Sequence, residues 1–190
     1  MAKSIFREYD IRGIFPTELN EQTVKKIGYH FALEVKSKVA NAKYISVGYD
    51  ARSHSPELEK WLVSGINHGG LEVLTMGLVP TPVNYFSNFM QFNTKTTSGS
   101  IMITGSHNPP EYNGFKITID KAPFFGEDIY TLGDAVLSSE LSIPDNTTSI
   151  HINAKEQYIN YLANEFKELQ LSNHSFVFDC GNGAAGAVLG

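Results

Sequence analysis

Short apolar runs and amphipathic segments alternate along the first part of the chain. Runs rich in β-branched residues predict strands at "KYISVG", "LEVLTMG" and "SGSIMIT". The segment 20–38 predicts a helix, because its apolar residues recur on one helical face: Val24, Ile27, Phe31 and Val35. "SPELEKWLVSGINHGG", with Ser55 as N-cap, and "VPTPVNYFSNFMQF" predict two more helices. This alternation predicts a mostly parallel sheet with helices on both faces, a three-layer α/β/α domain.

The second half of the chain changes this pattern. "GFKITID" predicts an antiparallel strand, joined to the preceding one by a loop that contains Asn113 and Gly114. "GEDIYTLGDAVLSSE" and "AKEQYINYLANEFKELQL" predict helices on either side of a polar linker, and "FVFDC" predicts a last strand. A crossover from that strand would need ~10–12 further residues. We therefore expect a complete domain at 1–150 and, at 151–190, the first elements of a second, similar domain of a longer protein.

Composition narrows the class of protein. The 190 residues are 42% hydrophobic and 18% charged, which suffices for a globular core. The net charge is −5, and no Lys/Arg cluster has the pattern of a nucleic-acid binder. No segment resembles a signal peptide or a membrane span, and the single cysteine, Cys180, suits a reducing compartment. We therefore expect a cytoplasmic protein whose partners are neither nucleic acid nor membrane.

The stretch "TGSHNPPEYNGFK" is the strongest candidate for chemistry. It follows a strand, and ligands of parallel α/β sheets collect beyond the carboxyl ends of strands. Ser106 can act there as a nucleophile, and Lys116 can supply charge or a proton. We expect His107 to point away from Ser106, because neighbours in an extended loop face opposite sides. The same residue types also form ordinary turns, and a serine-hydrolase elbow would need glycines where Thr104 and Asn108 stand.

Three other stretches carry weaker signals. Arg12 in "FREYDIRG" suits phosphate through its planar fork, and a surface ion pair would explain it as well. "GYDARSHSP" puts Asp50 and Arg52 at a strand end. "GNGAAG" fits the dinucleotide-binding pattern, and a structural turn fits it too. The histidines lack metal-binding spacing, so a metal ion would need ligands from elsewhere.

Several of these stretches together resemble one family, the α-D-phosphohexomutases. The matching motifs occur in order along the chain: "YDIRG", "GYDARSHSPEL", "GLVPTPV", "TGSHNPPEYNGFK" and "DCGNGAAG". The resemblance runs from Phe6 to Gly186 and favours the bacterial phosphomannomutase/phosphoglucomutase branch, since the glucosamine-phosphate branch begins with a different first motif. Tyr49 departs from the family pattern, in which an arginine is frequent at this position.

The resemblance implies an enzyme that interconverts hexose 1-phosphate and hexose 6-phosphate. Ser106 would be a phosphoserine that donates its phosphoryl group to the sugar and regains one from a hexose 1,6-bisphosphate intermediate. Tyr9 and Arg12 would lie near this phosphate, flanked by His107 and Asn108, and Asn108 would bind phosphate or substrate.

The remaining roles also follow from the resemblance. Lys116 would be the general acid/base, and Arg52 would bind phosphate or substrate. A phosphate oxygen on Ser106 would be this segment's only Mg²⁺ ligand, the others coming from the family's third domain. The preference between mannose and glucose stays open, because the family's sugar-binding loops are not in this sequence.

Two consequences and two rival interpretations complete the picture. We expect the 190 residues alone to have no mutase turnover, and their exposed second-domain elements to promote self-association. A rival interpretation is a non-catalytic domain that binds a sugar phosphate or a protein partner. Another is a dinucleotide-dependent oxidoreductase.

Overall fold

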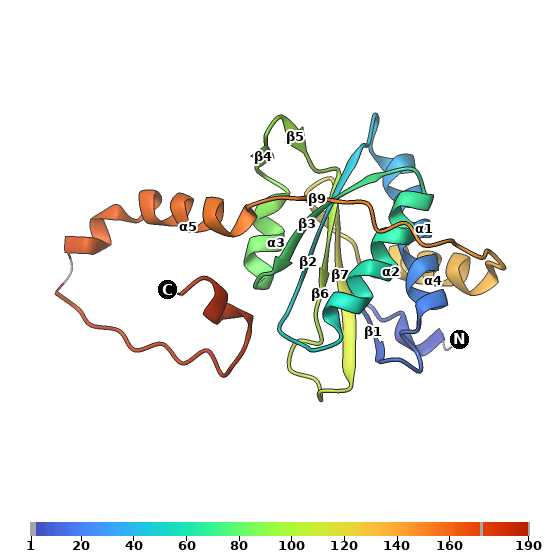
Figure 1. Cartoon of the computed structure of the whole chain (residues 1–190), viewed down its shortest axis with the longest axis horizontal. Helices are drawn as coiled ribbons and strands as arrows, with labels where there is room; N and C mark the ends of the chain where they lie inside the picture. The colour runs from blue at the N-terminus through green and yellow to red at the C-terminus, as the bar shows by residue number, and fades with distance from the viewer. Residues whose placement is uncertain (1–2, 172, 190) are drawn as a thin grey trace.

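The computed structural model describes residues 3–171 and 173–189 (Figure 1). The helices are α1 (Glu21–Lys38), α2 (Ser55–His68), α3 (Thr81–Ser87), α4 (Glu127–Ser138) and α5 (Ala154–Glu165), with short 3-10 helices η1 (Lys3–Ile5), η2 (Lys167–Leu171) and η3 (Ala184–Ala187). The strands are β1 (Ile11–Ile14), β2 (Tyr44–Tyr49), β3 (Glu72–Leu78), β4 (Gln91–Phe92), β5 (Lys95–Thr96), β6 (Gly99–Ile103), β7 (Tyr112–Ile119), β8 (Ala122–Pro123) and β9 (Ile150–His151).

One mixed sheet organises the fold. Its strand order is β1-β7-β6-β2-β3-β9, with β8 beside β7. β2 runs parallel to β3 and β6, and β3 runs parallel to β9. β7 is antiparallel to its neighbours β1, β6 and β8. Among the described strands of this sheet, only β7 therefore runs against the others, which confirms the mixed, mostly parallel sheet and the antiparallel addition.

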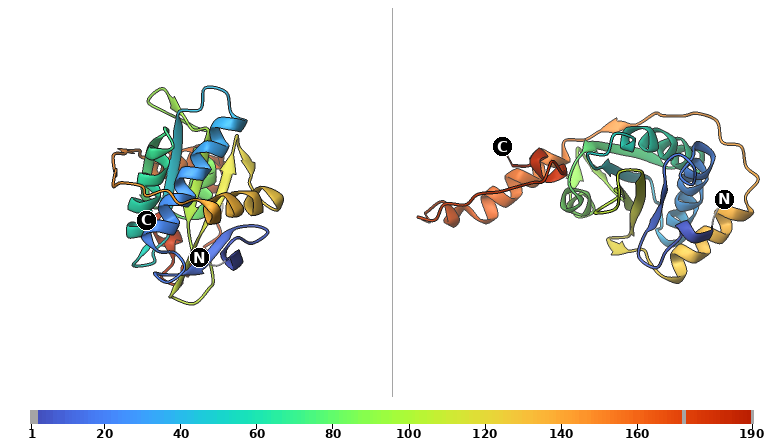
Figure 2. Two further views of the ribbon diagram at one scale, coloured as in Figure 1. Left: turned by 90° about the vertical axis from the view of Figure 1, so that its right-hand side faces the viewer. Right: turned by 90° about the horizontal axis from the view of Figure 1, so that it is seen from below.

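Helices cover both faces of the sheet, which confirms the three-layer α/β/α fold (Figures 1 and 2). α1, α2 and α4 share the larger hydrophobic core with one face, whereas α3 packs on the other face over a smaller cluster that includes Val83 and Met102. α1 begins where predicted, because Asn20 Oδ1 accepts a hydrogen bond from Thr23 N–H at 3.0 Å. Its predicted apolar face is fully buried: Val24, Ile27, Phe31 and Val35.

Two predicted boundaries in the first domain are wrong. The helix expected over "VPTPVNYFSNFMQF" ends at Ser87, and its last two residues form β4, which pairs with β5 in a hairpin. Asn88 ends this helix: its side-chain amide donates to Ser100 Oγ at 2.9 Å and accepts from Thr118 Oγ1 at 2.9 Å, which ties the backbone to the sheet. Asn113 and Gly114 lie inside β7 rather than in the loop before it.

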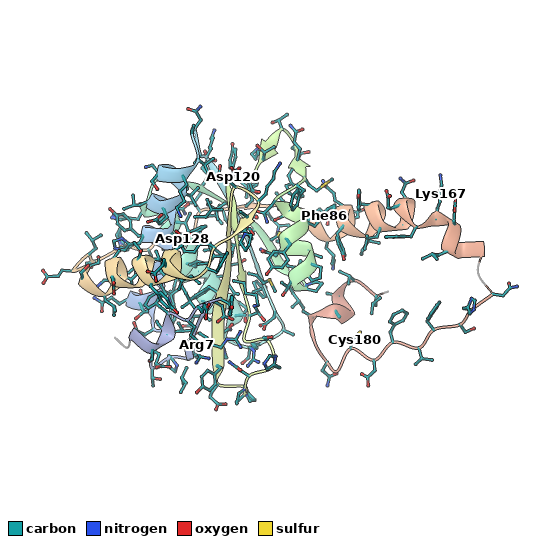
Figure 3. The ribbon with its side chains drawn as sticks, turned by 180° about the vertical axis from the view of Figure 1, so that it is seen from behind. Arg7, Phe86, Asp120, Asp128, Lys167 and Cys180 are labelled. Atoms are coloured by element: carbon teal, nitrogen blue, oxygen red, sulfur yellow. The ribbon has the colours of Figure 1, made fainter. Side chains whose placement is uncertain are left out.

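The segment after residue 150 differs most from the prediction. α5 is shorter than expected. It packs on α3, where the ring centroids of Tyr158 and Tyr161 each lie 5.3 Å from that of Phe86. Phe86 is labelled in Figure 3. The expected strand "FVFDC" does not form, and Val177 within it is 99% exposed. No described strand pairs with it, so its backbone lacks the partner that a strand requires. β9 adds residues 150–151 to the sheet, and the domain division at 150 stays a prediction.

Glu59 on α2 makes the stability of the fold depend on pH. Its Oε1 is buried without a hydrogen-bond partner among the described residues, and this burial raises the pKa of the carboxyl from 4.5 to about 7. The folded protein therefore favours the protonated acid. The Glu59 charge destabilises the fold fully above pH 7, and this penalty disappears as the pH falls below the unfolded value of 4.5.

Replacing the acid should remove this dependence. We expect Glu59→Gln to raise the free energy of unfolding by up to about 3 kcal/mol near pH 8 and to change it little near pH 4. Urea unfolding at both pH values measures the difference, with the exposed Glu57→Gln as the matched control. A gain of equal size at both pH values would contradict the titration of Glu59.

Candidate active site

The turn between β6 and β7 holds Ser106 at the surface, beyond the carboxyl end of β6. Ser106 is exposed and has a left-handed backbone, with φ of 53°. Its N–H donates to Thr104 Oγ1 at 2.9 Å, and the N–H of Asn108 donates to the Gly105 carbonyl at 3.0 Å. These bonds fix a tight turn with the serine hydroxyl at its tip.

His107 does not point away from Ser106, so this prediction is wrong. The Ser106 Oγ atom lies 3.3 Å from His107 Nδ1. The expectation assumed an extended loop, in which successive side chains alternate. The left-handed backbone at Ser106 breaks that alternation and brings both side chains to one side. The imidazole can therefore exchange a hydrogen bond with the hydroxyl.

A cluster of charged side chains lies beside this turn. Arg12 is 8% exposed, pairs with the Asp10 carboxylate through Nη2, and donates from Nη1 to the Gly105 carbonyl at 3.3 Å. Lys116 Nζ lies 3.7 Å from the same Asp10 carboxylate. Strand pairing produces this arrangement, because β1 and β6 both flank β7 and place Arg12 opposite Gly114. Asp10 thus joins two cations that are far apart in sequence.

Sequence reasoning assigned no role to Asp10. Asp10 is 9% exposed, and a carboxylate so buried requires cationic partners. The sequence did contain a signal: an acidic residue two positions before Arg12, at the start of an otherwise apolar strand. The pairing with Lys116 depends on β7 and could not be inferred from the local sequence.

Tyr9 lies with the aromatic side chains around Lys116. It is 70% exposed, and its ring stacks on Phe125 with centroids 6.4 Å apart. Tyr9, Tyr85 and Phe125 line a cavity of about 260 Å³ together with Lys116. Burial raises the pKa of the Tyr85 hydroxyl, and the nearby Asp10 carboxylate adds to the shift. The cavity therefore combines aromatic rings with one ammonium group.

Asp50 supports the turn from the end of β2. Its Oδ2 accepts from Gly105 N–H at 3.1 Å, and its Oδ1 accepts from the backbone N–H of Arg52 at 3.1 Å. Ser55 Oγ donates to the same oxygen at 2.8 Å and accepts from Asn113 Nδ2 at 2.9 Å. Ser55 was expected as the N-cap of α2, but the cap residue is His54. The Ser55 hydroxyl instead joins β2 to β7.

Arg52 lies against the same turn. Its two Nη atoms donate to four backbone carbonyls, those of Ser106, Asn108, Pro109 and Tyr112, at 2.7–3.2 Å. Its Nε lies 3.5 Å from Asp50 Oδ2. The guanidinium expected to bind phosphate thus contacts the protein's own backbone.

A cleft of about 560 Å³ opens next to the Ser106 turn. Its lining includes Ser106, Asn108, Asp50 and Arg52 at the turn, and Asn182 and Gly183 of the C-terminal segment. The cleft has the size of a small-molecule site.

The predicted site residues form two groups, one at the Ser106 turn and one around Asp10. His107, Asn108 and Arg52 contact the turn itself. Arg12 reaches it through the Gly105 carbonyl, whereas Lys116 and Tyr9 lie on the Asp10 side.

The described residues offer little to other chemistries. They contain no group of three or more His, Cys, Asp or Glu side chains that could hold a metal ion. "GNGAAG" does not lie between a strand and an α-helix, the context that a dinucleotide-binding turn requires. Within the described ranges, no helix is long and apolar enough to cross a membrane.

Comparison with known proteins identifies the family. Residues 3–133 match the family model "Phosphoglucomutase/phosphomannomutase, alpha/beta/alpha domain I". The chain is 35% identical to the phosphomannomutase/phosphoglucomutase of Pseudomonas syringae pv. tomato, covering 99% of this chain and 38% of that protein. It is 33% identical to the phosphoglucomutase of Neisseria meningitidis serogroup B, covering 100% of this chain and 40% of that protein.

Solved structures agree with this assignment. A phosphoglucomutase/phosphomannomutase family protein from Burkholderia thailandensis superposes with a TM-score of 0.79 at 30% identity, over 87% of this chain and 36% of that chain. The chain spans about two fifths of the length of the curated relatives it matches. The match over residues 3–133, the sequence identity and the shared fold show that this chain belongs to the phosphoglucomutase/phosphomannomutase family.

Proposed function

We propose that the complete protein is a phosphohexomutase that interconverts hexose 1-phosphate and hexose 6-phosphate through a phosphoserine at Ser106. The observation that carries this proposal is the exposed Ser106 hydroxyl on a fixed turn, beside the Arg12, Asp10 and Lys116 cluster. Phosphoryl transfer needs positioning and positive charge more than covalent chemistry. A rigid turn and two cations meet that need.

In the proposed step, a sugar hydroxyl attacks the phosphorus carried on Ser106. The new P–O bond to the sugar forms as the bond to Ser106 Oγ breaks, and the hydroxyl proton passes through Lys116 Nζ to the departing Oγ. Arg12 donates a hydrogen bond to the Gly105 carbonyl of the turn, and its positive charge stabilises the transferring phosphoryl group. After the bisphosphorylated sugar turns around, the reverse transfer from its other phosphate restores phosphoserine.

The donor set of this chain does not by itself make a Mg²⁺ site. Ser106 is the proposed contribution, through a phosphate oxygen, and the Arg12 and Lys116 side chains nearby are cationic. Oxygen ligands, which Mg²⁺ prefers, would have to come from outside these residues. No step proposed above passes through the metal. The cytoplasmic location, a hexose 1,6-bisphosphate activator and inactivity of the 190 residues alone remain predictions.

A coupled assay on the complete protein tests this function. We expect turnover with Mg²⁺, a hexose 1,6-bisphosphate primer and either mannose 1-phosphate or glucose 1-phosphate, and the ratio of kcat/KM values ranks the two sugars. A folded, complete protein that converts neither sugar phosphate would contradict the proposal.

A further inference from the structure

The Nη N–H groups of Arg52 all donate to the protein itself. An arginine side chain carries five N–H donors: two on each Nη and one on Nε. The four Nη donors meet four carbonyl oxygens of the Ser106 turn, and Nε faces Asp50. The side chain is 15% exposed, so this arrangement is also largely shielded from water. An incoming phosphate would have to break these contacts before it could bind Arg52.

The four carbonyls belong to one short stretch of backbone. They span 106–112, from Ser106 to the first residue of β7. Two prolines in this stretch, Pro109 and Pro110, have no N–H and cannot donate hydrogen bonds within the turn. Arg52 supplies further hydrogen-bond donors to the turn. Its single rigid guanidinium binds the carbonyls of four residues and so fixes their relative positions.

Asp50 completes the attachment from the other side of the turn. It accepts from Gly105 N–H and faces Arg52 Nε through the same Oδ2 atom. Asp50 thus binds a backbone N–H group of the turn, whereas Arg52 binds its carbonyl groups. Gly105 permits this close approach, since a Cβ there would lie only 2.3 Å from Arg52 Cζ and Nε.

From this geometry we infer that Arg52 is a positioning residue for phosphoryl transfer and not a phosphate ligand. It fixes the backbone of the Ser106 turn, and with it the left-handed conformation that sets the direction of Ser106 Oγ. The inference rests on the proposed function for its effect on catalysis. The attachment itself can be tested without turnover.

Hydrogen exchange on the 190-residue chain tests the attachment. We expect Arg52→Met to speed amide exchange at Gly105 and Asn108 by about tenfold or more, because the turn opens more often. Arg7→Met, at an exposed arginine outside the turn, should leave both rates unchanged. Unchanged exchange in a folded Arg52→Met chain would overturn the inference.

Kinetics of the complete protein test the role in catalysis. We expect Arg52→Met and Gly105→Ala each to lower kcat by about 10²-fold, with KM for the hexose phosphate changed less than about threefold. Gly105→Ala retains the arginine and displaces only its flexible end, so it answers the question even where Arg52→Met fails to fold. Arg52→Lys should not rescue, because one ammonium has three donors for four carbonyls.

The outcomes separate the alternatives. A raised KM with kcat retained in Arg52→Met would make Arg52 a phosphate ligand. Normal kinetics in Gly105→Ala would show that catalysis does not need the guanidinium in this position. Either outcome would overturn the inference. Gly186→Ala, where a Cβ meets open space, is the matched glycine control. If the unmodified complete protein shows no turnover, the proposed function fails, and the exchange experiment still decides whether Arg52 holds the turn.

Discussion

Ser106→Ala in the complete protein should lower mutase turnover by about 10⁴-fold or more, the effect typical of removing a covalent nucleophile. The reason is specific to the proposed mechanism: without Oγ there is no atom to carry the phosphoryl group between the two sugar positions. Because Ser106 is exposed, the substitution should leave the fold intact. A coupled assay with a hexose 1,6-bisphosphate primer measures the loss.

Ser138→Ala is the matched control for this substitution. Ser138 is an exposed serine on α4 whose hydroxyl donates to backbone carbonyls of its own helix, those of Asp134 and Ala135. It should retain full turnover. If Ser106→Ala lost less than about tenfold of the turnover of the unmodified protein, the phosphoserine mechanism would be wrong.

Lys116→Met should lower kcat by about 10²–10⁴-fold, the range typical for loss of a general acid/base. Lys116 Nζ lies 3.7 Å from the Asp10 carboxylate, which also pairs with Arg12, and Lys116 lines the aromatic cavity. Methionine keeps the length of the side chain and removes only its proton-transferring group. Steady-state kinetics on the complete protein measure the change.

Two further variants interpret this result. Lys60→Met, at an exposed lysine of α2, controls for loss of surface charge and should be silent. Asp10→Asn keeps the lysine but removes its carboxylate partner, and should therefore impair kcat less than Lys116→Met does. An unimpaired kcat in Lys116→Met would assign the proton transfer to another group, and His107 at 3.3 Å from Ser106 Oγ would be the first candidate.

Periodicity predicted the first domain well because packing and pattern agree there. The apolar face of α1 is buried as the spacing of Val24, Ile27 and Phe31 implies, and Asn20 caps the helix. The prediction failed where side chains far apart in sequence decide the backbone. α3 ends at Ser87 because Asn88 bonds to Ser100 and Thr118 on the sheet, a contact that no local pattern contains.

The C-terminal segment failed for a different reason. The residues around Val177 have the composition of a buried strand, yet a strand exists only beside a partner. In the part of the chain that the structure describes, no partner strand lies next to them.

The candidate site shows the same division between local and long-range information. Residue types and order singled out Ser106, Lys116 and Arg12 as candidates, because each lies in a distinctive motif. The sequence could not show that Asp10 contacts both Arg12 and Lys116, or that the Arg52 guanidinium donates to backbone carbonyls. Both facts depend on strand order. The direction predicted for the His107 side chain was wrong because it assumed an extended loop, whereas Ser106 has a φ of 53°.

The central claim is that Ser106 carries the phosphoryl group, and peptide mass spectrometry of the freshly purified, active complete protein tests it most directly. The account predicts one phosphoryl group on the peptide that contains "TGSHNPPEYNGFK", at Ser106, which disappears after incubation with excess hexose monophosphate and returns with hexose 1,6-bisphosphate. An active enzyme with Ser106 unmodified under both conditions, or with its exchangeable phosphate on another residue, would contradict it.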